Sequence, residues 1–257
     1  MIDFYDVPLL LIFCAGLALI WSISELGWRR GVRSTGESTN IGTLESATVG
    51  LLALLIAFTF AMALSRFEAR RDAVVQEANA IGTTALRARF LPQPHRAEVL
   101  KLLRDYVKVR IEAFQGGHSF AELKSTVDRS NALQEALWQQ AEALAQETKT
   151  LIPTGLFVQS LNQMIDAQGV RLAALRNQIP GIVLLALYVL AAVSGGFVGY
   201  ASAIDPRLNR LPVLIMGLLI SLVLYLIMDI DRPNSGFITN SQQAMIDVAE
   251  TIKGFRD

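Results

Sequence analysis

Residues 42–71 read GTLESATVGLLALLIAFTFAMALSRFEARR, an apolar run that leads into charged residues without a proline or glycine between them. Its apolar part, Gly42–Ser65, is long enough to cross the hydrocarbon core of a bilayer, which takes about 20 helical residues. Good helix formers continue from Arg66 to Phe90, so we expect one helix that spans the membrane and extends beyond it. The prolines at 92 and 94 end this helix because proline cannot continue its hydrogen-bond ladder.

Three further apolar segments have a similar length: Val7–Gly27, Ile179–Ala201 and Leu211–Met228. The four segments form two pairs, and the region between the pairs is charged with helical periodicity. We therefore predict an all-α membrane protein with four transmembrane helices and an extramembrane helical bundle inserted between the second and third. Both of these membrane helices are expected to continue into the bundle. The predicted parts are a first hairpin (1–65), the bundle (66–178), a second hairpin (179–230) and a C-terminal tail with a short helix (231–257).

The composition supports a membrane protein and excludes several other classes. Hydrophobic residues make up 52% of the chain, and the formal net charge is zero, so nothing indicates binding to nucleic acid. His95 and His118 stand apart without metal-ligand spacing, so we expect neither a metal site nor a cofactor. No phosphate-binding loop or nucleophile motif is present in the sequence, so we do not expect an enzyme.

The second membrane helix has two distinct faces at 100° per residue. One face is a stripe of small residues that lets another helix approach closely: Ser46, Gly50, Ala53, Ala57 and Ala61. The other face combines an acid, hydroxyl groups and an aliphatic zone: Glu45, Thr48, Val49, Leu52, Ile56, Thr59 and Ala63. Such an order of polar and aliphatic zones is typical of a pore lining, and an aliphatic constriction can gate by dewetting. The same face is also consistent with ordinary helix packing, with the acid at the membrane interface.

Charged residues mark the other end of the membrane segments: Arg66, Arg70, Arg71, Asp229, Asp231 and Arg232. The acids after the fourth segment could form an ion entrance or a salt bridge to the arginines of the second helix, and the salt bridge is favoured. On the third membrane helix, close packing is predicted at three glycines: Gly195, Gly196 and Gly199.

Two stretches resemble a known family. The first is ESATVGLLALLIAFTF (45–60), followed by SRFEARR (65–71), EANAIGT (77–83) and LP (91–92); the second is DIDRPNSGFI (229–238). Together they resemble uncharacterised bacterial membrane proteins with a bestrophin-like domain, and more distantly the bestrophins. Bestrophins are pentameric ion channels whose second helix lines the pore and carries a hydrophobic neck. The resemblance implies a homo-oligomer, with five subunits favoured, and a neck formed by Leu52 and Ile56, with Phe58 or Phe60.

The leading hypothesis is thus an oligomeric ion channel of the bacterial inner membrane whose pore is lined by the second helix. Glu45 favours monovalent cations, whereas Arg66 and Arg70 favour anions; we expect cations because Glu45 lies nearer the low-dielectric region. The alternative is a non-conducting membrane scaffold or sensor acting through the bundle; a transporter is less consistent with unbroken helices.

The numbers of arginines on the two sides of the membrane are nearly equal, so they do not decide the orientation. Arg29, Arg30, Arg33, Arg207 and Arg210 lie on one side, and Arg66, Arg70, Arg71, Arg171, Arg176 and Arg232 on the other. The resemblance favours a cytoplasmic bundle.

Overall fold

The computed structural model describes residues 7–34, 41–112, 120–147, 151–204, 210–233 and 236–255. Its helices are α1 (Leu9–Val32), α2 (Ile41–Ala88), α3 (His95–Glu112), α4 (Phe120–Glu147), α5 (Leu151–Arg176), α6 (Gly181–Ile204), α7 (Arg210–Asp231) and α8 (Gln243–Lys253). Within the described ranges there is no β-strand. The chain divides into unit 1 (residues 1–66, 178–232 and 236–238) and unit 2 (67–177, 233–235 and 239–257). Arg207 and His118 lie outside the described residues.

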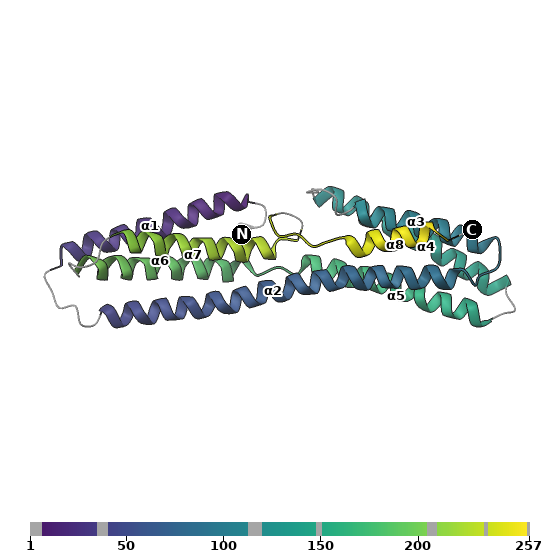
Figure 1. Ribbon diagram of the computed structural model, residues 1–257, viewed down its shortest axis with the longest axis horizontal. Helices are drawn as coiled ribbons and strands as arrows, with labels where there is room; N and C mark the ends of the chain where they lie inside the picture. The colour runs from purple at the N-terminus through teal and green to yellow at the C-terminus, as the bar shows by residue number, and fades with distance from the viewer. Residues whose placement is uncertain are drawn as a thin grey trace. The chain divides into compact units, whose positions relative to one another are not determined.

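Unit 1 contains α1, the first part of α2, α6 and α7, and all four are long and apolar enough to cross a membrane. Within this unit α1 packs against α6 and α7, and α6 also contacts α7 (Figure 1). Large apolar side chains point outward from these helices, for example Ile182, Leu211 and Leu10, which are about two-thirds exposed in the single chain. A water-soluble protein does not expose apolar surface of this extent, so lipid or other subunits cover it. The protein is therefore a multi-pass membrane protein.

Glycines set the distance between α1 and α6. A Cβ atom on Gly27 would lie 2.1 Å from the carbonyl oxygen of Gly196, and one on Gly199 would lie 2.2 Å from the carbonyl oxygen of Ser24. Because both obstacles are backbone atoms, no side-chain movement relieves these contacts. Only glycine lets the two helices approach this closely, which increases the van der Waals contact that holds helices together in lipid.

Unit 2 is a helical bundle with its own apolar core. The second part of α2 together with α3, α4, α5 and α8 buries a continuous cluster that includes Ile81, Leu103, Leu137, Phe157 and Met245, each fully shielded from solvent. Burying a large apolar side chain contributes about 1.5–3 kcal/mol. A core of this kind lets the bundle fold in water, as expected of a region outside the membrane.

The two joins between bundle and membrane helices differ. The second membrane helix continues as one α-helix from Ile41 to Ala88, as predicted. The third does not: α5 ends at Arg176, residues 177–180 are not helical, and α6 starts at Gly181. The reason is Pro180, which lacks an N–H group and disfavours helical geometry at the residue before it. The expected continuous helix is thus wrong at this point.

Candidate functional site

The face of α2 that was predicted to line a pore lies partly in the interior of unit 1. Leu52, Thr59 and Ala63 are 2%, 4% and 0% exposed, and the Thr59 hydroxyl donates to the Leu55 carbonyl oxygen of the same helix at 2.7 Å. The other members of the predicted face are half-buried: Glu45, Thr48, Val49 and Ile56. Burial of this kind is what the alternative of ordinary helix packing predicts for Leu52, Thr59 and Ala63. The pore-lining role of this face stays a prediction.

The opposite face of α2 is open in the single chain. All five members of the predicted packing stripe are exposed: Ser46, Gly50, Ala53, Ala57 and Ala61. A Cβ atom added at Gly50 would meet no atom within 4 Å. Two large apolar residues on the same side, Leu54 and Phe58, are 52% and 61% exposed. Any close helix contact along this stripe must therefore come from outside this chain.

The charged residues at the end of α7 connect elements of unit 1. Asp231 is 1% exposed; its Oδ2 atom accepts a hydrogen bond from the Ile179 backbone N–H at 2.7 Å, and its Oδ1 atom lies 4.0 Å from Nη1 of Arg66. Arg232 donates to the Val7 carbonyl oxygen at 2.6 Å. Asp231 thus ties the non-helical segment before α6 to α7 and α2, in the arrangement expected of an inter-helix salt bridge.

Asp229 shapes the turn that follows α7. Its carboxylate accepts hydrogen bonds from the backbone N–H groups of Phe237 at 3.0 Å and Ile238 at 3.0 Å. Gly236 adopts φ +128°, and a Cβ atom there would lie 2.2 Å from Oδ1 of Asp229. This conformation and this close approach both require glycine. Both acids of the motif DIDRPNSGFI are thus engaged within unit 1, and its glycine is required by the local backbone.

In unit 2, one carboxylate is shared by two buried arginines. Oε1 of Glu77 accepts from Nε of Arg110 at 2.6 Å, and its Oε2 accepts from Nη1 of Arg171 at 2.6 Å. The hydroxyl of Tyr106 also donates to Oε1, at 3.2 Å. Glu77, Arg110 and Arg171 are each at most 1% exposed. These three residues, which we call the buried charge cluster, join α2, α3 and α5.

Amide side chains surround the buried charge cluster. Gln134 donates to the Tyr106 hydroxyl at 3.2 Å and to the side-chain oxygen of Gln168, and Nη2 of Arg171 donates to the Gln242 side chain at 2.7 Å. Burial lowers the pKa of Arg171, and the neighbouring Glu77 carboxylate opposes that shift. Burial also raises the pKa of Tyr106, so its hydroxyl stays protonated and acts as a donor. The cluster links three helices of the bundle and contains no exposed acid or base.

The structure also places the remaining predicted arginines and glycines. Arg70 is buried in unit 2, whereas Arg71 is exposed. Gly195 and Gly196 face α1, where added Cβ atoms would lie 3.3 Å from Ile20 and 3.1 Å from Ile23. Among the described residues, no three His, Cys, Asp or Glu side chains are grouped to hold a metal ion.

Sequence reasoning missed the buried charge cluster and Gly27. A signal exists for each. Arg110 follows Leu103 and Tyr106 at helical spacing, so a charged residue stands in phase with a buried apolar stripe. Gly27 and Gly31 repeat at the four-residue spacing of close-packed membrane helices.

Comparisons with known proteins agree with this architecture. The family model of the bestrophin-like domain matches residues 11–245. A crystal structure of a bacterial Bestrophin homolog from Klebsiella pneumoniae has a TM-score of 0.65 to this chain at 16% identity, covering 97% of this chain and 98% of that one. A mutant of a bacterial Bestrophin homolog from the same organism gives a TM-score of 0.66 at 16% identity, covering 92% and 97%. No curated protein matches the sequence. The structures show a shared fold, and the extent of the family match shows that the chain belongs to the bestrophin-like domain family.

Proposed function

We propose that this protein is the subunit of an oligomeric ion channel in which α2 surrounds the pore with the face that is exposed in the single chain. The observation that carries the proposal is the open stripe of Gly50, Ala57 and Ala61, with Leu54 and Phe58 beside it. Small residues allow the same helix of neighbouring subunits to approach closely around an axis. Membership of the bestrophin-like family supports a channel, and the resemblance to bestrophins supports five subunits.

The hydrophobic neck moves to new positions in this proposal. Leu52 is buried in its own subunit. In this proposal, residues on the opposite side of the helix therefore face the pore axis. Leu54 and Phe58 are four residues apart and therefore share one side of α2. Apolar side chains of this size around an axis form a constriction that excludes water when closed. We assign the neck to Leu54 and Phe58.

The exposed charges of α2 favour monovalent cations. In unit 1, Arg66 is largely buried and near Asp231, and in unit 2 Arg70 is buried, so neither arginine is available to attract anions from solvent. Two acids in this part of α2, Glu68 and Asp72, are exposed, whereas Arg71 is the one exposed arginine between them. A ring of acids selects cations. We place the channel in the bacterial inner membrane with unit 2 on the cytoplasmic side.

Currents across planar bilayers test the proposed neck. Leu54→Ala and Phe58→Ala should each raise the current severalfold, because a smaller side chain makes the constriction wider and easier to wet. Leu52→Ala is the matched control for Leu54→Ala, because it removes the same side-chain atoms from the packed face of the helix. It should lower the free energy of unfolding by about 2–5 kcal/mol without raising the current. The opposite pattern, with current raised by Leu52→Ala alone, would contradict the assignment. An absence of current from all proteins would instead favour a non-conducting scaffold.

A further inference from the structure

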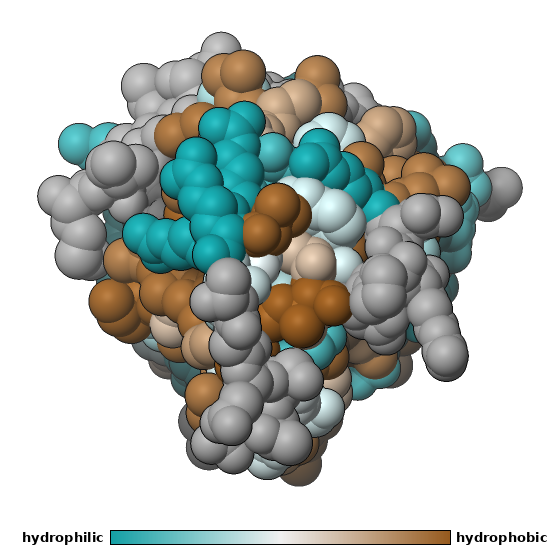
Figure 2. Space-filling view, turned by 90° about the vertical axis from the view of Figure 1, so that its left-hand side faces the viewer, coloured by the Kyte–Doolittle hydropathy of each residue, from teal (hydrophilic) through white to brown (hydrophobic). Residues whose placement is uncertain are grey.

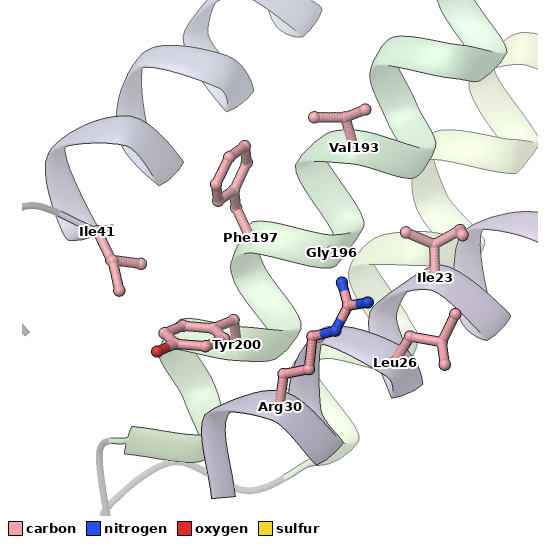
Figure 3. A pocket seen from close by; sticks show the side chains of 9 residues that line it. Ile23, Leu26, Arg30, Ile41, Val193, Gly196, Phe197 and Tyr200 are labelled. Carbon is pink, nitrogen blue, oxygen red and sulfur yellow. The ribbon is translucent and has the colours of Figure 1, made fainter. Parts of the chain in front are cut away.

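A hollow of about 320 Å³ lies on unit 1 between the ends of α1 and α6 and the start of α2. Its walls are mostly apolar side chains, among them Leu26, Ile41, Val193 and Phe197, and Arg30 and Tyr200 also line it (Figure 3). Gly196 lies between these walls and has no side chain to fill the space. The volume is at the lower end of the range for small-molecule sites.

Arg30 brings a positive charge to this apolar hollow. In Figure 3 its side chain extends from α1 toward Gly196 of α6. The acid nearest to it along α1, Glu25, is already engaged by Arg29 at 2.9 Å and by Arg210 at 3.6 Å. In the described part of the chain no acidic side chain pairs with Arg30. Its charge is therefore free to bind an anion from outside the chain.

The surroundings of Arg30 have the character of a membrane interface. Trp28 lies on the same turn of α1, and the Arg210 guanidinium sits 4.8 Å from the centre of its ring. Tryptophan and arginine gather where lipid headgroups begin. On this end face of unit 1, at the left of Figure 1, Figure 2 shows hydrophilic and hydrophobic surface side by side. A ligand for the hollow must thus be apolar over most of its length and anionic at one end.

We infer that the hollow binds one anionic phospholipid per subunit, with its phosphate on Arg30 and an acyl chain along Val193 and Phe197. Guanidinium groups form paired, charge-assisted hydrogen bonds with phosphate. The apolar wall provides the area that an acyl chain buries, and charge complementarity selects an anionic headgroup over a zwitterionic one. This site is separate from the proposed pore, because its lining residues lie mainly on α1 and α6.

Native mass spectrometry of the full-length protein in detergent tests this inference. The probes are phosphatidylglycerol and phosphatidylcholine with identical acyl chains. The wild type should retain phosphatidylglycerol in preference to phosphatidylcholine. Arg30→Gln should reduce this preference about fivefold, the effect of one arginine at an anionic surface. Val193→Trp should fill the hollow and weaken the binding of both lipids.

Two control variants isolate the hollow from its surroundings. Arg33→Gln removes an exposed charge at the same end of α1, and Val189→Trp adds the same ring to an exposed position one turn away on α6; neither residue lines the hollow. Both controls should bind lipid like the wild type, with circular dichroism confirming that every variant is folded. Equal preference in Arg30→Gln and the wild type would overturn the inference. A second result would also overturn it: the wild type retains no lipid, and Val193→Trp changes the oligomeric state. A second copy of the chain would then occupy the hollow.

Discussion

Glu77→Gln should destabilise unit 2 by about 3–5 kcal/mol, the cost of removing one partner from a buried ion pair. The Glu77 carboxylate is the acceptor at 2.6 Å for both Arg110 and Arg171, and all three side chains are at most 1% exposed. A glutamine keeps the size of the side chain but removes its negative charge. Two guanidinium groups would then remain close together in the bundle core without a counter-charge. Thermal unfolding of the purified protein, followed by circular dichroism and limited proteolysis of the bundle, measures the effect.

A neighbouring acid on the same helix provides the control. Glu68 is exposed, so Glu68→Gln should change the unfolding temperature little. A triple variant, Glu77→Met with Arg110→Leu and Arg171→Met, should recover much of the stability, because replacing a complete buried ion cluster by apolar residues is often neutral. If Glu77→Gln unfolds at the wild-type temperature, the buried charge cluster does not hold α2, α3 and α5 together.

Gly27→Ala should separate α1 from α6 and destabilise unit 1 by about 1–3 kcal/mol, the usual cost of overpacking. The new Cβ atom would lie 2.1 Å from the Gly196 carbonyl oxygen and 3.1 Å from the Tyr200 backbone nitrogen. Backbone atoms of a helix cannot rotate away as a flexible side chain can, so the helix axes must move apart. Heating in detergent, followed by size-exclusion chromatography of what remains monodisperse, measures the loss.

The same substitution at an open glycine separates packing from helix propensity. A Cβ atom at Gly42 meets nothing within 4 Å, and alanine stabilises a helical position relative to glycine. Gly42→Ala should therefore leave the unfolding temperature unchanged or raise it. Equal behaviour of the two alanine variants would show that α1 and α6 are not in contact at Gly27.

Element order could be predicted from the sequence because its signals are strong and local. Four long apolar runs predicted the membrane helices, and the absence of proline from Gly42 to Phe90 predicted the continuity of α2 that the structure shows. The join at Pro180 had a local signal too, because proline interrupts the hydrogen-bond ladder of a helix, but the third membrane helix was expected to continue into the bundle. The structure has a non-helical segment there. The Asp231 carboxylate holds this segment by accepting a hydrogen bond from the Ile179 backbone N–H group.

The orientation of α2 about its axis could not be predicted from the sequence. In a bilayer, an apolar side chain has a similar free energy facing lipid or facing the protein core. Periodicity therefore distinguishes two faces of the helix but does not indicate which one is buried. The small-residue face was predicted to pack closely against another helix, and the face of Leu52 and Ala63 to line the pore. The structure buries Leu52 and Ala63 and exposes Gly50 and Ala57. Long-range pairing was equally out of reach, since Glu77 and Arg171 are 94 residues apart.

Electron microscopy of the purified protein in nanodiscs, viewed down the membrane normal at side-chain resolution, tests the central claim most directly. A pore between subunits requires a ring with rotational symmetry. We predict a closed ring with α2 of every subunit nearest the axis, Leu54 and Phe58 turned toward the axis, and Leu52 turned into its own subunit. A monomer, a dimer sealed through α2, or a ring whose axis is lined by Leu52 would contradict the account.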